Sequence, residues 1–257
     1  MGSAARAHDR RILVDRELLR RPAGPRAISQ VDSGRRASRH DMPPIAMTLC
    51  GTSLLRMATI PPMSHSTSHP PVDLSLTTRG DYHPGRSFAV RSLWFLVEAV
   101  VFLNPVVTSY RVKRSLLTLF GSTVGPGLII KPGVHIKYPW RLTLGSNVWL
   151  GERAWLDNME DIVIGDSVCI SQGAYLCTGN HDWSDPGMRL APRPIAVESG
   201  AWIGAFGRVG PGIRVGCEAV LTLGSTLQAD AEPRGIYSGT PASRVGTRRL
   251  RASSQPS

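Results

Sequence analysis

Aliphatic residues recur at every sixth position through the second half of the chain. The run begins at Val197 and continues through Ile203, Val209, Val215, Leu221 and Leu227. An α-helix would repeat its apolar positions at steps of three and four residues, and a half-buried strand would repeat them at steps of two. A step of six therefore predicts short strands joined by tight turns, with each aliphatic side chain directed into one interior.

The same step appears upstream in groups of three. Intervals of eight residues separate the groups, which are Val124/Ile130/Ile136, Leu144/Leu150/Leu156 and Ile164/Ile170/Leu176. Three hexads make one triangular coil, and stacked coils pair as parallel strands around a continuous aliphatic column. Where a glycine directly follows a repeat residue, we expect a tight turn that favours a residue without Cβ. These glycines are Gly125, Gly145, Gly165, Gly204, Gly210 and Gly216.

Two helical stretches are predicted ahead of the coils, at 87–104 and 109–120, with Asn104-Pro105 ending the first. Packing against the coils is the favoured interpretation, because apolar helical faces usually belong to a core. The alternative is peripheral membrane contact through 88–120, since an apolar stretch followed by three basic residues is typical of an interfacial anchor. The apolar run contains two charges and is shorter than the roughly 20 residues of a bilayer span.

The net charge of +11 over 257 residues is concentrated near the N-terminus. Residues 1–62 hold eleven arginines and five acids, a net of +6, which leaves +5 for the other 195 residues. This placement argues against a nucleic-acid partner for the coils. The Arg-, Ser- and Pro-rich composition of 1–62 predicts a disordered tail. Because acids are present, a mis-assigned start, with Met63 as the first residue, is favoured over a transit peptide.

Cysteine usage points to a reducing compartment. The four cysteines form no C-x-x-C pair and are too sparse for a disulfide scaffold: Cys50, Cys169, Cys177 and Cys217. We therefore expect reduced thiols and a cytoplasmic protein, with the inner face of the membrane as the alternative site.

Longer segments carry a resemblance to a known family. They are PGRSF, IKPGVHIKYPWRL, AWLDN, CISQGAYLCTGNHDWSDP, PIAVESGAWIGA and GIYSGTPA. Over roughly residues 70–245 the chain resembles the hexapeptide-repeat acyltransferases, most closely the WcaF-type acetyltransferases of colanic acid biosynthesis. The resemblance implies an all-β, left-handed parallel β-helix, whereas the general rule for parallel crossovers would give a right-handed one.

The expected organisation follows from the repeat and the resemblance together. A helical segment is expected at 63–120 and the β-helix domain at 121–230. A loop is extruded at 177–196, because the interval from Leu176 to Val197 is 21 residues instead of six or eight. A basic tail is expected at 231–257.

His181 is the candidate catalyst. It belongs to the only His-Asp pair within the coils, on the extruded loop, and loops on rigid scaffolds are where catalytic groups collect. Acyl transfer from a thioester to a sugar hydroxyl needs a base for the hydroxyl proton, and imidazole titrates near neutral pH. A lone loop histidine is more often a surface or turn-stabilising residue; the family match at GNHD favours the catalytic interpretation.

Several polar residues are candidates for orienting His181 or binding the sugar. Asp182 is adjacent to the histidine, and Asp157 is a second carboxylate, placed below the root of the loop by the 20-residue coil spacing. Asn158, Asn180 and Trp183 are candidate substrate contacts. Turn capping is an equally good explanation of Asp157 and Asn158.

The resemblance also implies that acetyl-CoA, the co-substrate, lies in a groove between adjacent coils. The matching residues here are Trp202, Gly204, Ala205 and Leu223. Leucine at 223 departs from the small residue usual in the family, so the groove is narrowed or the acyl donor is unusual. Arg244 and Arg248 are candidates for the CoA phosphate, with a solvated basic tail as the alternative.

The expected function is therefore O-acetyl transfer from acetyl-CoA to a saccharide acceptor in exopolysaccharide biosynthesis, by a homotrimer without a bound metal or permanent cofactor. A non-catalytic hexapeptide-repeat scaffold is the main alternative, because of Leu223. A metal-dependent γ-carbonic-anhydrase-like protein is disfavoured, since 121–257 holds only two histidines and a catalytic zinc normally takes three protein ligands. The sequence does not indicate which sugar hydroxyl is acetylated.

Overall fold

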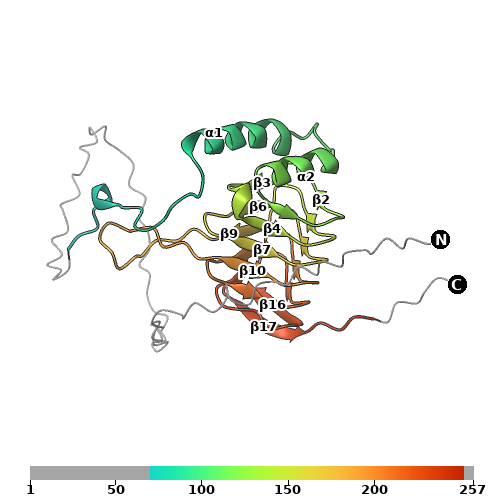
Figure 1. Ribbon diagram of the computed structural model, residues 1–257. Helices are drawn as coiled ribbons and strands as arrows, with labels where there is room; N and C mark the ends of the chain where they lie inside the picture. The colour runs from blue at the N-terminus through green and yellow to red at the C-terminus, as the bar shows by residue number, and fades with distance from the viewer. Residues whose placement is uncertain (1–69, 252–257) are drawn as a thin grey trace, which may run out of the picture. The chain divides into compact units, whose positions relative to one another are not determined.

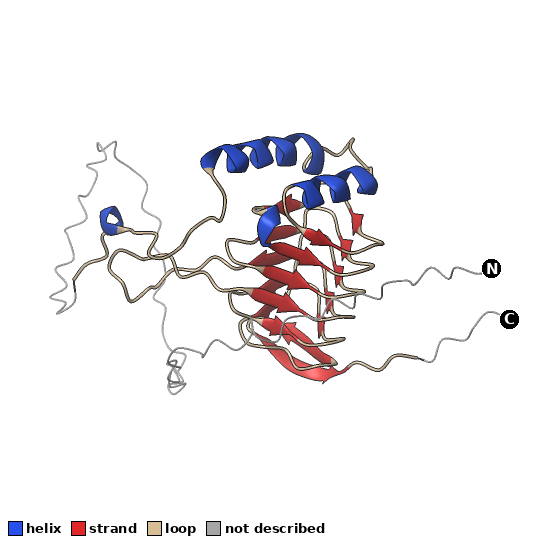
Figure 2. Cartoon of the chain, viewed as in Figure 1, coloured by secondary structure: helices blue, strands red, loops and turns tan. Residues whose placement is uncertain are grey.

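The computed structural model describes residues 70–251, which form a parallel β-helix with helices at one end (Figures 1 and 2). The predicted tail at 1–62 lies outside these residues. Ahead of the coils come a short 3-10 turn, two helices and a π-helical turn: η1 (Leu74–Leu76), α1 (Phe88–Val97), η2 (Glu98–Phe102) and α2 (Tyr110–Leu119). A further 3-10 turn, η3 (Pro139–Arg141), lies between the first two coils. No helix within the described range is both long and apolar enough to cross a bilayer.

Three sheets make the faces of the prism, and successive strands visit them in turn. The first face holds β1 (Thr123–Val124), β4 (Leu142–Leu144), β7 (Ile162–Ile164), β10 (Ile195–Val197) and β13 (Arg214–Val215). The second holds β2 (Ile129–Ile130), β5 (Trp149–Leu150), β8 (Cys169–Ile170), β11 (Trp202–Ile203), β14 (Val220–Leu221), β16 (Gly235–Gly239) and β17 (Ala242–Thr247). The third holds β3 (His135–Ile136), β6 (Trp155–Asp157), β9 (Tyr175–Cys177), β12 (Arg208–Val209) and β15 (Thr226–Leu227).

The registers confirm the hexad prediction residue by residue. On the second face, for example, Ile130 pairs with Leu150, then Ile170, Ile203 and Leu221. All five side chains are fully buried. The column of repeat residues is therefore the core, and all the pairings between coils are parallel.

The glycines that follow repeat residues serve a different purpose from the one expected. Gly145 does not have a positive φ; a Cβ there would lie 2.7 Å from the carbonyl carbon of Gly165 in the next coil. The left-handed backbone occurs two residues later, for example at Asn147 with φ 57°. Close stacking of coils, and not turn conformation, thus explains glycine directly after the aliphatic residue.

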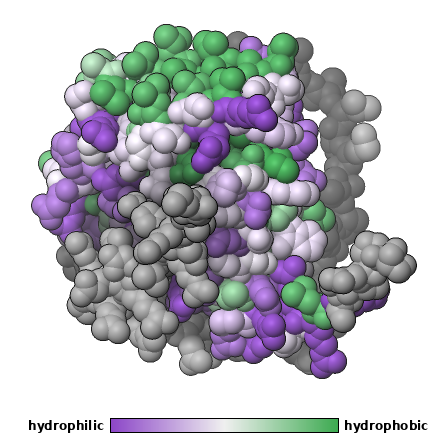
Figure 3. Space-filling model, turned by 45° about the vertical axis from the view of Figure 1, so that its right-hand side comes forward, coloured by the Kyte–Doolittle hydropathy of each residue, from purple (hydrophilic) through white to green (hydrophobic). Residues whose placement is uncertain are grey.

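The helices form a cap over the first coil. Trp94 and Phe102 are buried against it, and the Trp94 indole N–H donates to the carbonyl of Ile136 (2.7 Å). The N–H of Ile136 donates to the Glu98 carboxylate (2.7 Å), and that of Gly133 to the carbonyl of Phe102 (2.8 Å). The favoured packing role is therefore observed for the inner side of the cap, while its outer side is also apolar (Figure 3).

The segment expected as a basic tail from 231 is instead largely structured. β16 pairs in parallel with β14, and β17 returns antiparallel to β16, so a hairpin completes the end of the second face. Tyr237 continues the column above Leu221 and is buried. The sequence did not predict this hairpin, because β17 is largely exposed and carries Arg244, and only β16 alternates buried and less buried residues.

Candidate active site

The residues between β9 and β10 form a two-stranded arm. Backbone hydrogen bonds join the two sides of the arm: the N–H of Arg193 donates to the carbonyl of Thr178 (2.9 Å), and the N–H of Ala191 donates to the carbonyl of Asn180 (2.9 Å). His181 and Leu190 form an antiparallel β-bridge further along the arm. The extruded loop is thus ordered by its own pairing.

A segment upstream of the helical cap supports the arm. The N–H of Asp73 donates to the carbonyl of Pro186 (2.9 Å), and the N–H of Leu190 donates to the carbonyl of Thr78 (3.4 Å). Gly187 lies against the carbonyl of Leu76, at a distance where a Cβ would clash (2.7 Å). The sequence showed no periodicity in this segment that would have predicted the contact.

The His181 ring is exposed on the arm and is held at one nitrogen. Its Nδ1 lies 2.6 Å from the backbone carbonyl of Met188. A carbonyl can only accept, so the contact requires the hydrogen on Nδ1, and in the neutral ring Nε2 then carries the lone pair. The group that orients this histidine is therefore a backbone carbonyl of the arm itself.

Neither predicted carboxylate hydrogen-bonds to His181. Asp182 accepts from the N–H (3.1 Å) and hydroxyl (2.5 Å) of Ser184 and pairs with Arg189 (3.6 Å). The Ser184 hydrogen bonds hold the pKa of Asp182 below its usual value. Although Asp182 is adjacent to His181 in the sequence, the turn directs its carboxylate to Ser184.

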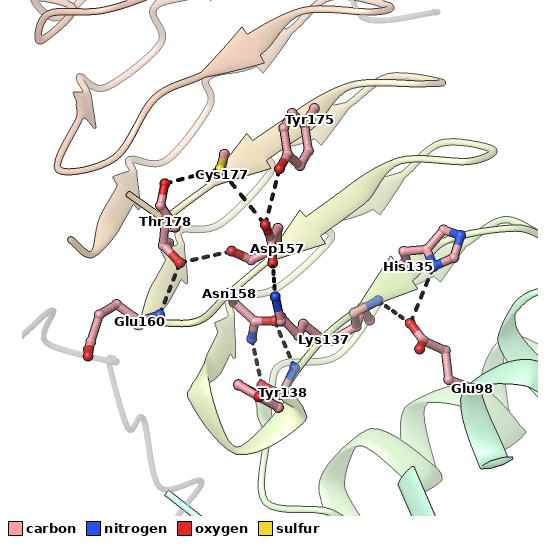
Figure 4. A network of polar contacts seen from close by, with 12 residues as sticks. Glu98, His135, Lys137, Tyr138, Asp157, Asn158, Glu160, Tyr175, Cys177 and Thr178 are labelled. Atoms are coloured by element: carbon pink, nitrogen blue, oxygen red, sulfur yellow. Dashed lines mark hydrogen bonds and ion pairs between the residues drawn. The ribbon is translucent and has the colours of Figure 1, made fainter. Parts of the chain in front are cut away.

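Asp157 is the centre of a polar network at the root of the arm (Figure 4). Its carboxylate accepts from the Lys137 ammonium (2.9 Å) and the Tyr175 hydroxyl (3.1 Å), and its backbone carbonyl accepts from the Thr178 hydroxyl (2.8 Å). Burial, with Cys177 and Asp157 nearby, raises the pKa of Tyr175, which keeps its proton. Asp157 is thus hydrogen-bonded to residues of the neighbouring coils, as the 20-residue spacing suggested. It supports the root of the arm and makes no hydrogen bond to His181.

Asn158 has the capping role that was the alternative to substrate binding. Its side chain is fully buried; it accepts from the N–H of Tyr138 (2.9 Å) and donates to the carbonyls of Tyr138 (2.5 Å) and Arg141 (3.2 Å). These contacts favour the capping interpretation of Asn158 over a substrate contact, because both polar atoms of its amide are bonded to the backbone at η3. Asn180 and Trp183 lie exposed on the arm.

A cavity of about 340 Å³ lies beside the arm. The returning strand of the arm forms one wall, and the segment before the helical cap forms another. Polar groups from separate parts of the chain meet there: Asp81, Tyr82, Glu160 and Arg189, with Leu190, Ala191 and Pro192 completing the lining. No motif predicts this convergence, since the residues lie in separate segments of the chain.

The predicted cofactor residues meet at a single corner of the prism. The N–H of Gly204 donates to the carbonyl of Leu221 (2.8 Å), and the N–H of Gly224 donates to the carbonyl of Ala205 (2.8 Å). Gly204, Ala205 and Leu223 therefore stack in adjacent coils, and the Leu223 side chain is 72% exposed. Trp202 precedes them on β11, and its indole donates to the Ser171 hydroxyl (2.9 Å).

The two candidate phosphate-binding arginines already have partners on the chain. Arg244 pairs with Glu232 (2.8 Å). Arg248 donates to the backbone carbonyls of Gly200 (2.8 Å) and Glu218 (3.3 Å). Both belong to the C-terminal hairpin region and its pairing with the coils, which is the reason they are not free cations of a tail.

The arm and the predicted acetyl-CoA residues lie at different corners of the prism. The arm leaves between β9 and β10, where the chain passes from the third face to the first. Gly204 and Ala205 lie after β11, where the chain passes from the second face to the third. Within residues 70–251, no cluster of three His, Cys, Asp or Glu side chains is arranged to hold a metal ion.

Comparison with known proteins connects this geometry to acetyl transfer. No family model matches the chain. The chain is 35% identical over 150 residues to WcaF of Escherichia coli K12, named for a role as an acetyltransferase in colanic acid biosynthesis, covering 58% of this chain and 82% of that protein. It is 26% identical to the galactoside O-acetyltransferase of the same organism over 133 residues, or 50% of this chain and 65% of that one.

The fold is also found among solved structures. A hexapeptide-repeat acetyltransferase from Vibrio cholerae, solved in complex with acetyl coenzyme A, superimposes with a TM-score of 0.57 at 20% identity, over 63% of this chain and 88% of that one. At this identity the superposition establishes a shared β-helix fold.

Proposed function

Because the chain belongs to the family of hexapeptide-repeat acetyltransferases that includes WcaF, we propose that it is an O-acetyltransferase that moves an acetyl group from acetyl-CoA to a saccharide hydroxyl in exopolysaccharide or related oligosaccharide biosynthesis. His181 is the general base. The observation that carries this assignment is the contact of Nδ1 with the carbonyl of Met188, which leaves the Nε2 lone pair in the exposed part of the arm.

The chemistry requires one base that acts twice. Nε2 of His181 accepts the proton of the acceptor hydroxyl as its oxygen attacks the thioester carbon. The new C–O bond forms, the C–S bond breaks, and the imidazolium returns its proton to the leaving thiolate. The Met188 carbonyl stabilises the imidazolium and keeps the ring in the useful tautomer, the role that a carboxylate has in a catalytic triad.

The acceptor is proposed to enter the cavity beside the arm. The carboxylate, phenol and guanidinium groups of this cavity suit a ligand rich in hydroxyls. The cavity volume of about 340 Å³ has room for a sugar unit. Leu190, in the wall of the cavity, forms an antiparallel β-bridge with His181 across the arm. The name of WcaF and the galactoside acetyltransferase relative support a saccharide as the substrate class.

Acetyl-CoA is proposed to lie along the groove at Gly204, Ala205 and Leu223. Support comes from the stacking of these residues in adjacent coils and from the acetyl-CoA complex of the Vibrio cholerae structure, which shares the fold. The Leu223 side chain narrows this groove. If it prevents donor binding, the chain is a non-catalytic scaffold, which is the second candidate function.

A homotrimer is proposed because the arm and the groove occupy different corners of one prism. A second copy can bring its groove to the arm of the first, and closed cyclic assemblies satisfy every such site equally.

An acetyl-transfer assay on the full chain tests the function. Thiol release from acetyl-CoA should depend on an added oligosaccharide, and mass spectrometry should find one acetyl group on the product. Absence of thiol release with every saccharide tested, together with no measurable binding of acetyl-CoA, would favour the scaffold. Acetyl-CoA binding by the Leu223→Ala variant then shows whether the Leu223 side chain prevents donor binding.

A further inference from the structure

The helical cap exposes an apolar surface on its outer side. The inner side of α1 and η2 packs on the first coil through Trp94 and Phe102. The outer side presents further large apolar side chains, and Figure 3 shows them as a continuous apolar region at the top of the molecule. They are Phe88 (75% exposed), Phe95 (71%), Leu96 and Val100, with Val106 in the turn that follows. A helix that is apolar on all sides is normally covered, so this surface indicates a contact that the chain alone does not complete.

The charges around this surface have one sign. Residues 86–120 contain four arginines, Arg86, Arg91, Arg111 and Arg114, and their single acid is Glu98. Their one lysine, Lys113, is fully buried and donates to the carbonyl of Lys131 in the first coil, so it does not belong to this surface. Glu98 is buried on the inner side of the cap, and burial raises its pKa to about 7. Arg86, just before α1, and Arg111, in the first turn of α2, are exposed, and no acidic side chain of residues 86–120 is exposed. The Arg91 guanidinium lies over the Phe88 ring, 5.7 Å from its centroid, which places a cation within the apolar surface itself.

The dimensions also restrict the kind of contact. α1 and η2 together run from Phe88 to Phe102, which corresponds to roughly 22 Å of helix. That is too short for a bilayer span, and the inner side is occupied by the first coil. The helix can lie in an interface but cannot insert across one.

We propose that the outer side of the helical cap binds the surface of an anionic lipid bilayer. Phe95, Leu96 and Val100 enter the boundary between headgroups and acyl chains, with the helix axis in the membrane plane. The arginines meet lipid phosphates, where each cation strengthens attachment. This inference does not depend on acetyl transfer, because it involves no residue of the arm or the groove.

A second copy of the chain fits this surface less well. A symmetric contact through the outer side of the cap would bring the same basic residues of 86–120 from two copies into one interface, with no exposed acid from 86–120 to pair with them. An anionic bilayer offers acyl chains to the apolar side chains of this surface and negative charge to its arginines.

Vesicle flotation with the full chain tests the proposal. The probes are vesicles of phosphatidylcholine alone and vesicles in which about a third of the lipid is phosphatidylglycerol. The wild-type chain should bind the anionic vesicles and bind the zwitterionic ones far less. Phe95→Ser with Leu96→Ser should weaken binding to the anionic vesicles about tenfold or more. Arg86→Gln with Arg111→Gln should reduce the preference for anionic lipid.

Matched controls separate this surface from other apolar and basic parts of the chain. Val245→Ser removes an exposed apolar side chain on β17, at the other end of the coils, and Arg249→Gln with Arg251→Gln removes two exposed cations near the C-terminus. These variants should bind vesicles like wild type, and all variants should keep the wild-type melting temperature.

Two results would overturn the proposal. Binding that survives Phe95→Ser with Leu96→Ser would assign attachment to another part of the chain, such as the arginines of 1–62. A fall in oligomeric mass of that same folded variant in light scattering would show that a second copy covers the surface.

Discussion

Asn158 joins three backbone groups with one buried amide. Its replacement by alanine leaves the N–H and carbonyl of Tyr138 and the carbonyl of Arg141 without their partner. Buried groups that lose a hydrogen bond cost about 1–3 kcal/mol each, so Asn158→Ala should lower the free energy of unfolding by roughly 2–4 kcal/mol. Urea unfolding measures the change, and the exposed Asn180→Ala is the control. Equal stability of the two variants would contradict the capping role.

Glu98 should make the attachment of the cap depend on pH. Its pKa rises from 4.5 to about 7 on burial, so the folded state holds the proton more tightly than the unfolded one. This contribution to stability is complete below about pH 4.5, is lost as pH rises to about 7, and is worth up to roughly 3 kcal/mol. Glu98→Gln, which keeps an acceptor for the Ile136 N–H, should flatten that part of the stability profile.

Chemical unfolding at several pH values between 4 and 8 measures this effect. The exposed Glu232→Gln serves as the control and should leave the profile unchanged. An unaltered slope in Glu98→Gln would show that another group titrates.

At the residue scale, the sequence predicted the positions of residues near the candidate site, but it did not predict the contacts that their side chains make. The 20-residue spacing correctly put Asp157 and Asn158 below the root of the arm. Whether a side chain points outward or into the backbone depends on its rotamer and on η3, which no spacing reveals. The partner of His181 was missed for the same reason: it is a main-chain carbonyl, and every residue has one.

At the scale of elements, the hexad repeat was sufficient for all fifteen strands of the coils, β1 to β15, because each strand contains one aliphatic residue of the repeat in a fixed register. The C-terminal hairpin and the support of the arm by the segment before α1 were not predicted. Both depend on long-range backbone pairing, which leaves no period in the sequence.

Coil stacking gives a prediction for Gly145. A methyl group at this position would meet the backbone of Gly165 at 2.7 Å and the Asp166 carboxylate at 2.5 Å. Gly145→Ala should therefore separate the second and third coils and lower the free energy of unfolding by about 1–3 kcal/mol. Thermal unfolding provides the measurement. Gly246→Ala on β17, where the nearest atom lies at 3.8 Å, is the matched control; equal melting temperatures would refute the stacking explanation.

At the scale of the whole molecule, the separation of arm and groove predicts assembly. In the proposed mechanism the base lies at one corner of each prism and the donor residues lie at another, so we expect each site to be completed by a neighbouring copy in a homotrimer. Light scattering at micromolar concentration should give three times the chain mass of 27.8 kDa. A fully active monomer would contradict the shared site.

The central claim is that His181 acts as the base, and steady-state kinetics of His181→Ala test it most directly. Loss of the base should lower kcat by roughly 10²–10⁴-fold. The Kd for acetyl-CoA and the Tm should remain close to wild type, because the exposed ring contacts neither the groove nor the aliphatic core. His83→Ala, which removes an exposed histidine outside the arm, should retain activity. A folded His181→Ala variant with wild-type kcat would contradict the account.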